Sequence, residues 1–205
     1  MSYSFPYRST AEKIIAEEQA GFRAGRSTTE QVITLRILCE KYLQQQQDLY
    51  HVFIDFKTAF DRACHAALWA TMKKYNISTN LIRVIKNLYD KATSAVLFNS
   101  SIGDRFQTTV GVRQGCLLSS LLFDIFLERI MTDALEDHEG TVSIGGRTIT
   151  NFCFADDIDG EEEELAKLAG EEEELAKLVE RLDKASTAYG MEISAEKTKL
   201  MLNRC

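Results

Sequence analysis

Residues 151–165, "NFCFADDIDGEEEEL", end an apolar run with two adjacent aspartates, Asp156 and Asp157. Phe152 and Phe154 alternate with Cys153, a pattern typical of a strand with one face on the core. Upstream, "TVSIGGRTIT" places Gly145-Gly146 between two β-prone runs, which predicts a hairpin leading into this strand. Adjacent carboxylates repel each other, so their position after a buried strand predicts a site where a cation neutralises them.

A second buried strand is predicted in "LYHVFIDF", ending at Asp55. If the two strand ends are neighbours in one sheet, three carboxylates converge, which is costly unless cations neutralise them. Oxygen ligands with room for water and phosphate favour Mg²⁺. Two such ions about 3.5–4 Å apart hold the attacking and leaving oxygens of a phosphoryl transfer. The simpler alternative is that Asp156-Asp157 is a solvated turn, which is the commoner use of such a pair.

The rest of the chain alternates helices with short strands. Ser27-Thr28-Thr29-Glu30 is an N-cap signal and predicts that a helix follows. "SAVLFN" and "DRFQTTVGV" predict a hairpin that turns around residues 100–103. Further helices are expected at 61–75, 79–92 and 119–136. This mixed order predicts one α+β domain rather than a doubly wound parallel sheet.

A tandem repeat carries most of the acidity. "GEEEELAKL" occurs at 160–168 and at 170–178, and when its eight glutamates are left out the formal net charge of −7 becomes +1. Helical spacing of the apolar residues predicts an amphipathic helix that continues to about Ala188, with a break at Gly170 and a stop at Gly190. A coiled-coil dimerisation arm is the alternative, but Glu172 interrupts its apolar seam.

Several classes of protein are disfavoured. No run of eighteen apolar residues and no signal-peptide pattern occurs, so we expect no membrane partner and an intracellular, cytoplasmic or nuclear protein that is not secreted. The five cysteines are odd in number and lack a C-x-x-C pair, which argues against a disulfide framework or a cysteine zinc site.

Four segments resemble the palm motifs of reverse transcriptases, in particular the LINE-like, non-LTR retrotransposon branch. In chain order they are "FIDFKTAFD" at 53–61, "GVRQGCLLSSLLFDIF" at 111–126, "FADD" at 154–157 and "GMEISAEKTKLM" at 190–201. "EEQAGFRAGRSTTEQV" at 17–32 is similar to the segment that joins fingers to palm in that branch. The resemblance extends from about Glu17 to Leu202.

The resemblance implies a polymerase palm-like antiparallel sheet with helices packed on one face, partial fingers and no thumb. Residues 1–50 would be an N-terminal segment and a partial fingers-to-palm connection. Residues 51–205 would be the palm, with an acidic helical repeat at 160–179. The fingers of such enzymes supply basic residues for the triphosphate, for which Arg8, Arg23 and Arg26 would be weak substitutes.

The resemblance also implies roles for individual residues. Asp55, Asp156 and Asp157 would hold two Mg²⁺ ions, with Mn²⁺ as a possible substitute, and the backbone carbonyl of Phe56 would be a further ligand. Phe60 would be a gate against the ribose 2′-hydroxyl, although it also fits a core position. The residues assigned to the nucleotide and template pocket are Arg113, Gln114 and Gly115, and Arg113 fits an ordinary surface arginine equally well. Lys197 would protonate the departing pyrophosphate or be a solvated lysine.

The implied activity is RNA-directed DNA synthesis, with an RNA template, a DNA primer and a dNTP as partners. Two departures from the family predict weak or no activity in this chain. Leu118 or Ser120 stands where the family usually has proline, and Glu161–Glu164 stand where the second strand of the catalytic hairpin is expected. The alternatives are a catalytically dead palm that acts as an RNA-binding or assembly module and another two-metal palm, such as a nucleotide cyclase. Cyclases carry a Gly-Gly-Asp-Glu-type turn that this sequence lacks. The oligomeric state is left open.

Overall fold

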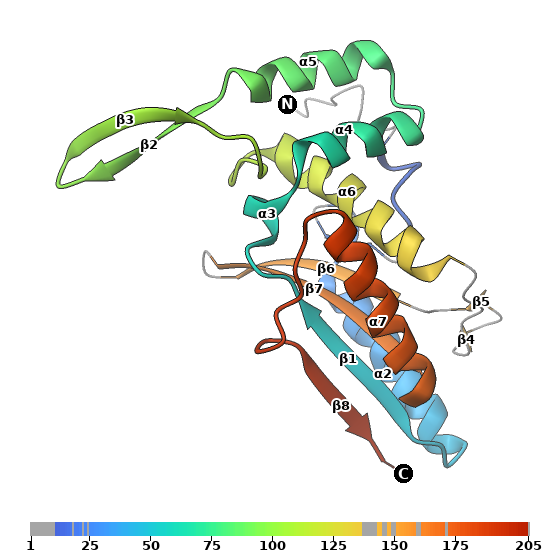
Figure 1. Ribbon diagram of the computed structural model, residues 1–205. Helices are drawn as coiled ribbons and strands as arrows, with labels where there is room; N and C mark the ends of the chain where they lie inside the picture. The colour runs from blue at the N-terminus through green and yellow to red at the C-terminus, as the bar shows by residue number, and fades with distance from the viewer. Residues whose placement is uncertain are drawn as a thin grey trace.

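The computed structural model describes residues 11–17, 19–21, 23, 25–136, 143–144, 147–148, 151–158, 161–170 and 172–204 (Figure 1). The helices are α2 Thr28–Gln44, α3 Ala59–Arg62, α4 His65–Lys74, α5 Thr79–Asp90, α6 Leu117–Leu135 and α7 Glu172–Ala188. The strands are β1 Leu49–Asp55, β2 Thr93–Phe98, β3 Ser101–Gln107, β4 Ser143–Ile144, β5 Arg147–Thr148, β6 Asn151–Ile158, β7 Glu161–Gly170 and β8 Lys199–Asn203.

The central sheet has four antiparallel strands in the order β6-β7-β1-β8. Val52 and Ile54 of β1 are buried in the main core together with residues of α6 and α7. Helix α7 lies over one face of the sheet and α2 lies behind it (Figure 1). His51, which alternates with Val52, is buried on the α2 side and contacts Cys39 of that helix. The predicted α+β palm-like fold is confirmed, and α2 adds a cover on the opposite face.

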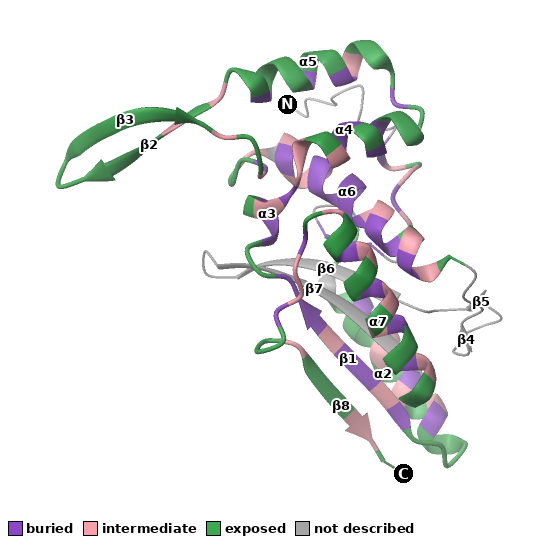
Figure 2. Cartoon of the chain, in the orientation of Figure 1, coloured by how far each residue is buried: buried purple, intermediate pink, exposed green. Residues whose placement is uncertain are grey.

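Several local predictions are also confirmed. The Ser27 hydroxyl accepts a hydrogen bond from the Glu30 amide at 3.3 Å and caps α2. The β2–β3 hairpin turns at Asn99 and Ser100, which both have positive φ, the geometry of a primed hairpin turn. The hairpin is exposed along nearly its whole length (Figure 2). The helix predicted over 61–75 is instead two helices, α3 and α4, because Cys64 between them forms a β-bridge with Val110.

The prediction that both copies of the repeat are helical is wrong for the first copy. Residues 161–170 form β7, whereas the second copy begins α7. The reason is that β7 pairs along its backbone with β6 on one side and β1 on the other, and this bonding outweighs local helix propensity. The break expected at Gly170 coincides with the end of β7.

Within the part of the chain that the structure describes, no helix is both long and apolar enough to cross a membrane. Cys39, Cys64 and Cys116 are free thiols.

Candidate active site at the end of strand β1

Asp55, the last residue of β1, is 3% exposed, and the segment 193–198 lies against it. The Asp55 carbonyl accepts a hydrogen bond from the Ser194 amide at 2.7 Å, and the Asp55 amide donates to Thr198 Oγ1 at 3.4 Å. Phe56 forms an isolated bridge with Ile193. Lys197 is exposed in the turn between these contacts. Two of the quoted segments, 53–61 and 190–201, therefore meet at the end of β1.

Glu192 ties the same two segments together through charge. Its carboxylate lies 2.6 Å from Lys57 Nζ and 2.9 Å from an Arg62 nitrogen, and its carbonyl accepts from the Lys57 amide at 2.8 Å. The hydrogen bond and charge of Lys57, aided by Arg62, lower the pKa of Glu192. No local sequence pattern distinguishes Glu192, Ser194 and Thr198 from ordinary loop residues, so their contacts were not predicted.

A close backbone approach brings the third segment, 111–126, against α3, which follows the end of β1. The Val112 amide donates to the Phe60 carbonyl at 2.7 Å and the Gly111 amide donates to the Ala63 carbonyl at 2.9 Å. Gly111 has φ +86°, and a Cβ at this position would lie 2.9 Å from the Asp61 carbonyl oxygen. Only glycine fits there without a shift of the backbone. This contact was not predicted from the sequence. It fixes the position of the backbone immediately before Arg113.

Arg113, Gln114 and Gly115 are all exposed in the loop before α6. Arg113 donates to the Leu88 carbonyl at 3.1 Å, and its guanidinium carbon lies 5.8 Å from the centre of the Tyr89 ring. These contacts fit the alternative that Arg113 is an ordinary surface arginine. They hold the loop against α5 and leave Gln114 and Gly115 facing solvent.

Phe60 is 4% exposed and stacks on Phe123 of α6, with ring centres 4.7 Å apart. This packing is what the core alternative for Phe60 requires. The gate role is untested by these contacts and stays a prediction.

The pairing of the strands relates Asp55 to the Asp156-Asp157 pair. Asp55 pairs with Leu165 of β7, and Leu165 pairs in turn with Phe154 of β6. Asp156 lies two residues further along β6, opposite Glu163. Because β7 separates the two strands, β1 and β6 lie about 10 Å apart. The side chains of Asp156 and Asp157 lie outside the described residues, so their roles as metal ligands stay predictions.

The part of the chain that can be described contains no group of three or more His, Cys, Asp or Glu side chains able to hold a metal ion. Asp55 is the one member of the predicted triad whose side chain is described, and the oxygen donors of an aspartate fit a hard cation.

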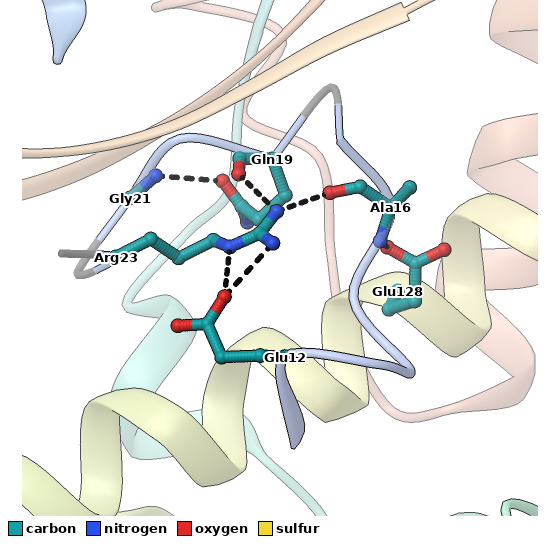
Figure 3. A network of polar contacts seen from close by, with 6 residues as sticks. All are labelled: Glu12, Ala16, Gln19, Gly21, Arg23 and Glu128. Atoms are coloured by element: carbon teal, nitrogen blue, oxygen red, sulfur yellow. Dashed lines mark hydrogen bonds and ion pairs between the residues drawn. The ribbon is translucent and has the colours of Figure 1, made fainter. Parts of the chain in front are cut away.

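The segment before α2 is fastened by a polar network rather than left open for a ligand (Figure 3). The Arg23 guanidinium lies 2.9 Å from the Glu12 carboxylate and donates to the carbonyls of Ala16 and Gln19. The Ala16 amide donates to Glu128 of α6 at 2.9 Å. The Arg23 side chain is only 7% exposed, so it is a structural residue and not a phosphate ligand in this arrangement.

Asp124 of α6 is 1% exposed, and neither carboxylate oxygen has a hydrogen-bond partner within the described part of the chain. Burial raises the pKa of Asp124 well above its usual value, and the positive charge of Arg23 offsets this only in part.

Comparison with known proteins identifies the family that shares these features. The family described as "Reverse transcriptase (RNA-dependent DNA polymerase)" matches residues 6–204. The chain is 32% identical over 117 residues to the probable RNA-directed DNA polymerase from transposon BS of Drosophila melanogaster. It is 31% identical over 119 residues to the corresponding protein from transposon X-element of the same organism. Each alignment covers 57% of this chain and 13% of the relative.

The fold is similar to that of apo telomerase from Candida tropicalis truncated from its C-terminal domain, with a TM-score of 0.68 and 18% identity. That alignment covers 98% of this chain and 40% of the telomerase chain.

Proposed function

Because the chain belongs to the reverse transcriptase (RNA-dependent DNA polymerase) family, in its LINE-like, non-LTR retrotransposon branch, we propose that it is a palm built for RNA-directed DNA synthesis. The reaction joins a primer 3′-hydroxyl to the α-phosphate of a dNTP opposite an RNA template and releases pyrophosphate. The chain spans 13% of the length of each relative described above.

Asp55, Asp156, Asp157 and the carbonyl of Phe56 would hold two Mg²⁺ ions, or Mn²⁺ in their place. Bound there, the cations would neutralise the carboxylates and stabilise the negative charge that develops on the attacking and leaving oxygens. The chain's own contribution is to hold these ligands at the end of a rigid sheet. Support comes from the backbone bonds that fix both neighbours of Asp55, namely Ile54 within β1 and Phe56 in its bridge with Ile193.

Three further residues would act on the nucleotide. Gln114 and Gly115 would line its pocket, where glycine allows the backbone to approach the ligand closely. The Lys197 ammonium would give a proton to the pyrophosphate as the bond to the α-phosphate breaks. Its turn is bonded at Ser194 and Thr198 to the backbone of Asp55, which supports a place near the reacting atoms.

The observation that carries the proposal is that segments 111–126 and 190–201 both bond to the stretch that runs from the end of β1 through α3, by backbone hydrogen bonds of 2.7 to 2.9 Å. The test is primer extension on a poly(rA) template with an oligo(dT) primer, dTTP and Mg²⁺ or Mn²⁺. Asp55→Asn and Asp156→Asn should each abolish extension without unfolding the chain, because each removes a charge that binds metal. Asp48→Asn, at an exposed position just before β1, is the matched control. Unchanged extension in Asp156→Asn would refute the assignment.

A second function is favoured by the pairing of β6 with β7. Asp156 lies opposite Glu163 and Asp157 lies opposite Glu162, and like charges directly opposite each other destabilise a sheet. This arrangement supports a weakly active or inactive palm that retains RNA binding or an assembly role. Filter binding of the same template, measured beside extension, separates the two functions. Binding that survives in Asp156→Asn, with no extension by the parent chain, would favour the binding module.

A further inference from the structure

Three side chains from distant parts of the sequence meet at the end of β1 opposite to Asp55. They are Cys39 of α2, His51 of β1 and Asn203 of β8. Cys39 Sγ lies 3.6 Å from His51 Nε2. Asn203 Nδ2 lies 2.9 Å from Cys39 Sγ and 3.1 Å from His51 Nε2. His51 is 2% exposed, whereas Cys39 and Asn203 are half-buried, so two of the three side chains are partly accessible to solvent.

The separation of sulfur and nitrogen in this cluster is that of two ligands of one zinc ion. With Zn–S near 2.3 Å and Zn–N near 2.0–2.1 Å, tetrahedral geometry puts the two donor atoms about 3.6 Å apart. A Zn²⁺ ion bound to both would need no movement of α2 relative to β1. A hard cation such as Mg²⁺ would not select this pair, because thiolate and imidazole are soft or borderline ligands.

The third side chain supports the same interpretation. Asn203 Nδ2 lies within hydrogen-bond distance of both the thiol sulfur and the imidazole nitrogen, so the three side chains face a common point. The nitrogen and oxygen of an amide exchange places by a half-turn of the group. That rotation would turn an oxygen donor toward an ion held by Cys39 and His51.

We propose that Cys39, His51 and Asn203 form a Zn²⁺ site, with Sγ, Nε2 and Oδ1 as ligands and water as the fourth. The thiol loses its proton to solvent when the ion binds, so binding strengthens as pH rises. The ion would fasten α2 and the edge strand β8 to β1. The site lies four residues along β1 from Asp55, about 13 Å away, and is independent of the proposed magnesium site.

The test uses Co²⁺ as a spectroscopic substitute for Zn²⁺ in a chain whose other cysteines, Cys64, Cys116, Cys153 and Cys205, are replaced by serine. Titration should give one thiolate-to-cobalt charge-transfer band that saturates at one ion per chain and disappears when Zn²⁺ is added. Cys39→Ser and His51→Gln should each remove it. The matched control keeps Cys116 as the single cysteine and should show no band.

A band that persists in His51→Gln, or that is absent from the parent chain, would overturn the proposal. Because His51 is buried and its variant risks unfolding, Asn203→Asp gives a second test at a half-buried edge position. A carboxylate there should tighten Co²⁺ binding about tenfold, a change of the size that even an outer-shell partner produces. An unchanged affinity would remove Asn203 from the site. Asp55→Asn should leave the band unaltered, which separates this site from the catalytic one.

Discussion

Replacement of Gly111 by alanine tests whether the contact between α3 and the loop before α6 is as tight as the structure indicates. Two costs add at this position. The first is the positive φ of +86°, which costs an alanine about 1–2 kcal/mol. The second is steric, because the new Cβ would lie 2.9 Å from the Asp61 carbonyl oxygen and 3.1 Å from the Phe60 carbonyl oxygen. Both are backbone atoms and cannot rotate away.

The steric cost can be estimated from the hydrogen bonds that must lengthen. A shift of Gly111 away from α3 weakens its own bond to the Ala63 carbonyl and the bond from Val112 to the Phe60 carbonyl. At about 1 kcal/mol each, their loss adds about 2 kcal/mol. We therefore expect Gly111→Ala to lower the free energy of unfolding by about 3–4 kcal/mol.

Gly25 provides a matched control, because its φ of +79° is similar and no atom of the described residues lies within 4 Å of an added Cβ. Gly25→Ala should cost only the conformational part, about 1–2 kcal/mol. Urea unfolding followed by the fluorescence of Trp69, the single tryptophan, measures both variants. Equal losses in the two variants would refute the claim that α3 and residues 111–112 are in tight contact.

Three further predictions concern buried and paired charges and the aromatic stack. Asp124→Asn should raise the free energy of unfolding at neutral pH, because burial raises the pKa of Asp124 in the folded state. The stability that the protonated Asp124 contributes is fully present below about pH 3.9, its pKa in the unfolded chain. That stability is lost as pH rises through the folded-state pKa. In urea titrations, the stability of Asp124→Asn should fall less than that of the parent chain as pH rises through this range. An identical pH dependence in the two chains would contradict the burial argument. Replacing Glu162 and Glu163 together by glutamine should stabilise the chain by about 0.5–2 kcal/mol, because two like-charge pairs across β6 and β7 are removed. The same change at Glu172 and Glu173 in α7 should give no gain, since acids in the first turn of a helix are favourable, and equal gains would rule out the cross-strand explanation. Phe60→Ala should cost about 3 kcal/mol through loss of the stack on Phe123. If Phe60 is also the ribose gate, primer extension by Phe60→Ala will use rNTP more readily relative to dNTP than the parent chain does. Unchanged selectivity between dNTP and rNTP would leave only the packing role.

The sequence was sufficient for features that are local. The apolar, aromatic and β-branched run "LYHVFIDF" predicted β1 and its end at Asp55, and the capping pattern at Ser27 predicted the start of α2. Features built from distant residues could not be predicted in this way. Glu192 pairs with Lys57 and Arg62, and Asn203 meets Cys39 and His51, but each partner alone is an ordinary surface or core residue. Only the pairing of β8 with β1 and the bridge at Phe56 bring them together.

The repeat shows most directly why local sequence was not enough. The sequence "EEEELAKL" occurs twice: the first copy, 161–168, forms a strand, whereas residues 172–178 of the second copy begin a helix. The first copy lies between Gly160 and Gly170, and an isolated helix of that length is marginal in water. The helix that begins in the second copy continues to Ala188 and buries Leu175, Leu178 and Leu182 against the core, which stabilises the helical form. Backbone pairing with β6 and β1 then decides the state of the first copy, although glutamate is a poor strand former. Strand β7, which joins β1 to β6 in the sheet, therefore has a sequence that disfavours the strand conformation. Any weakness of β7 would act directly on the alignment of Asp55 with Asp156, so the repeat should limit how well the proposed metal ligands are held together.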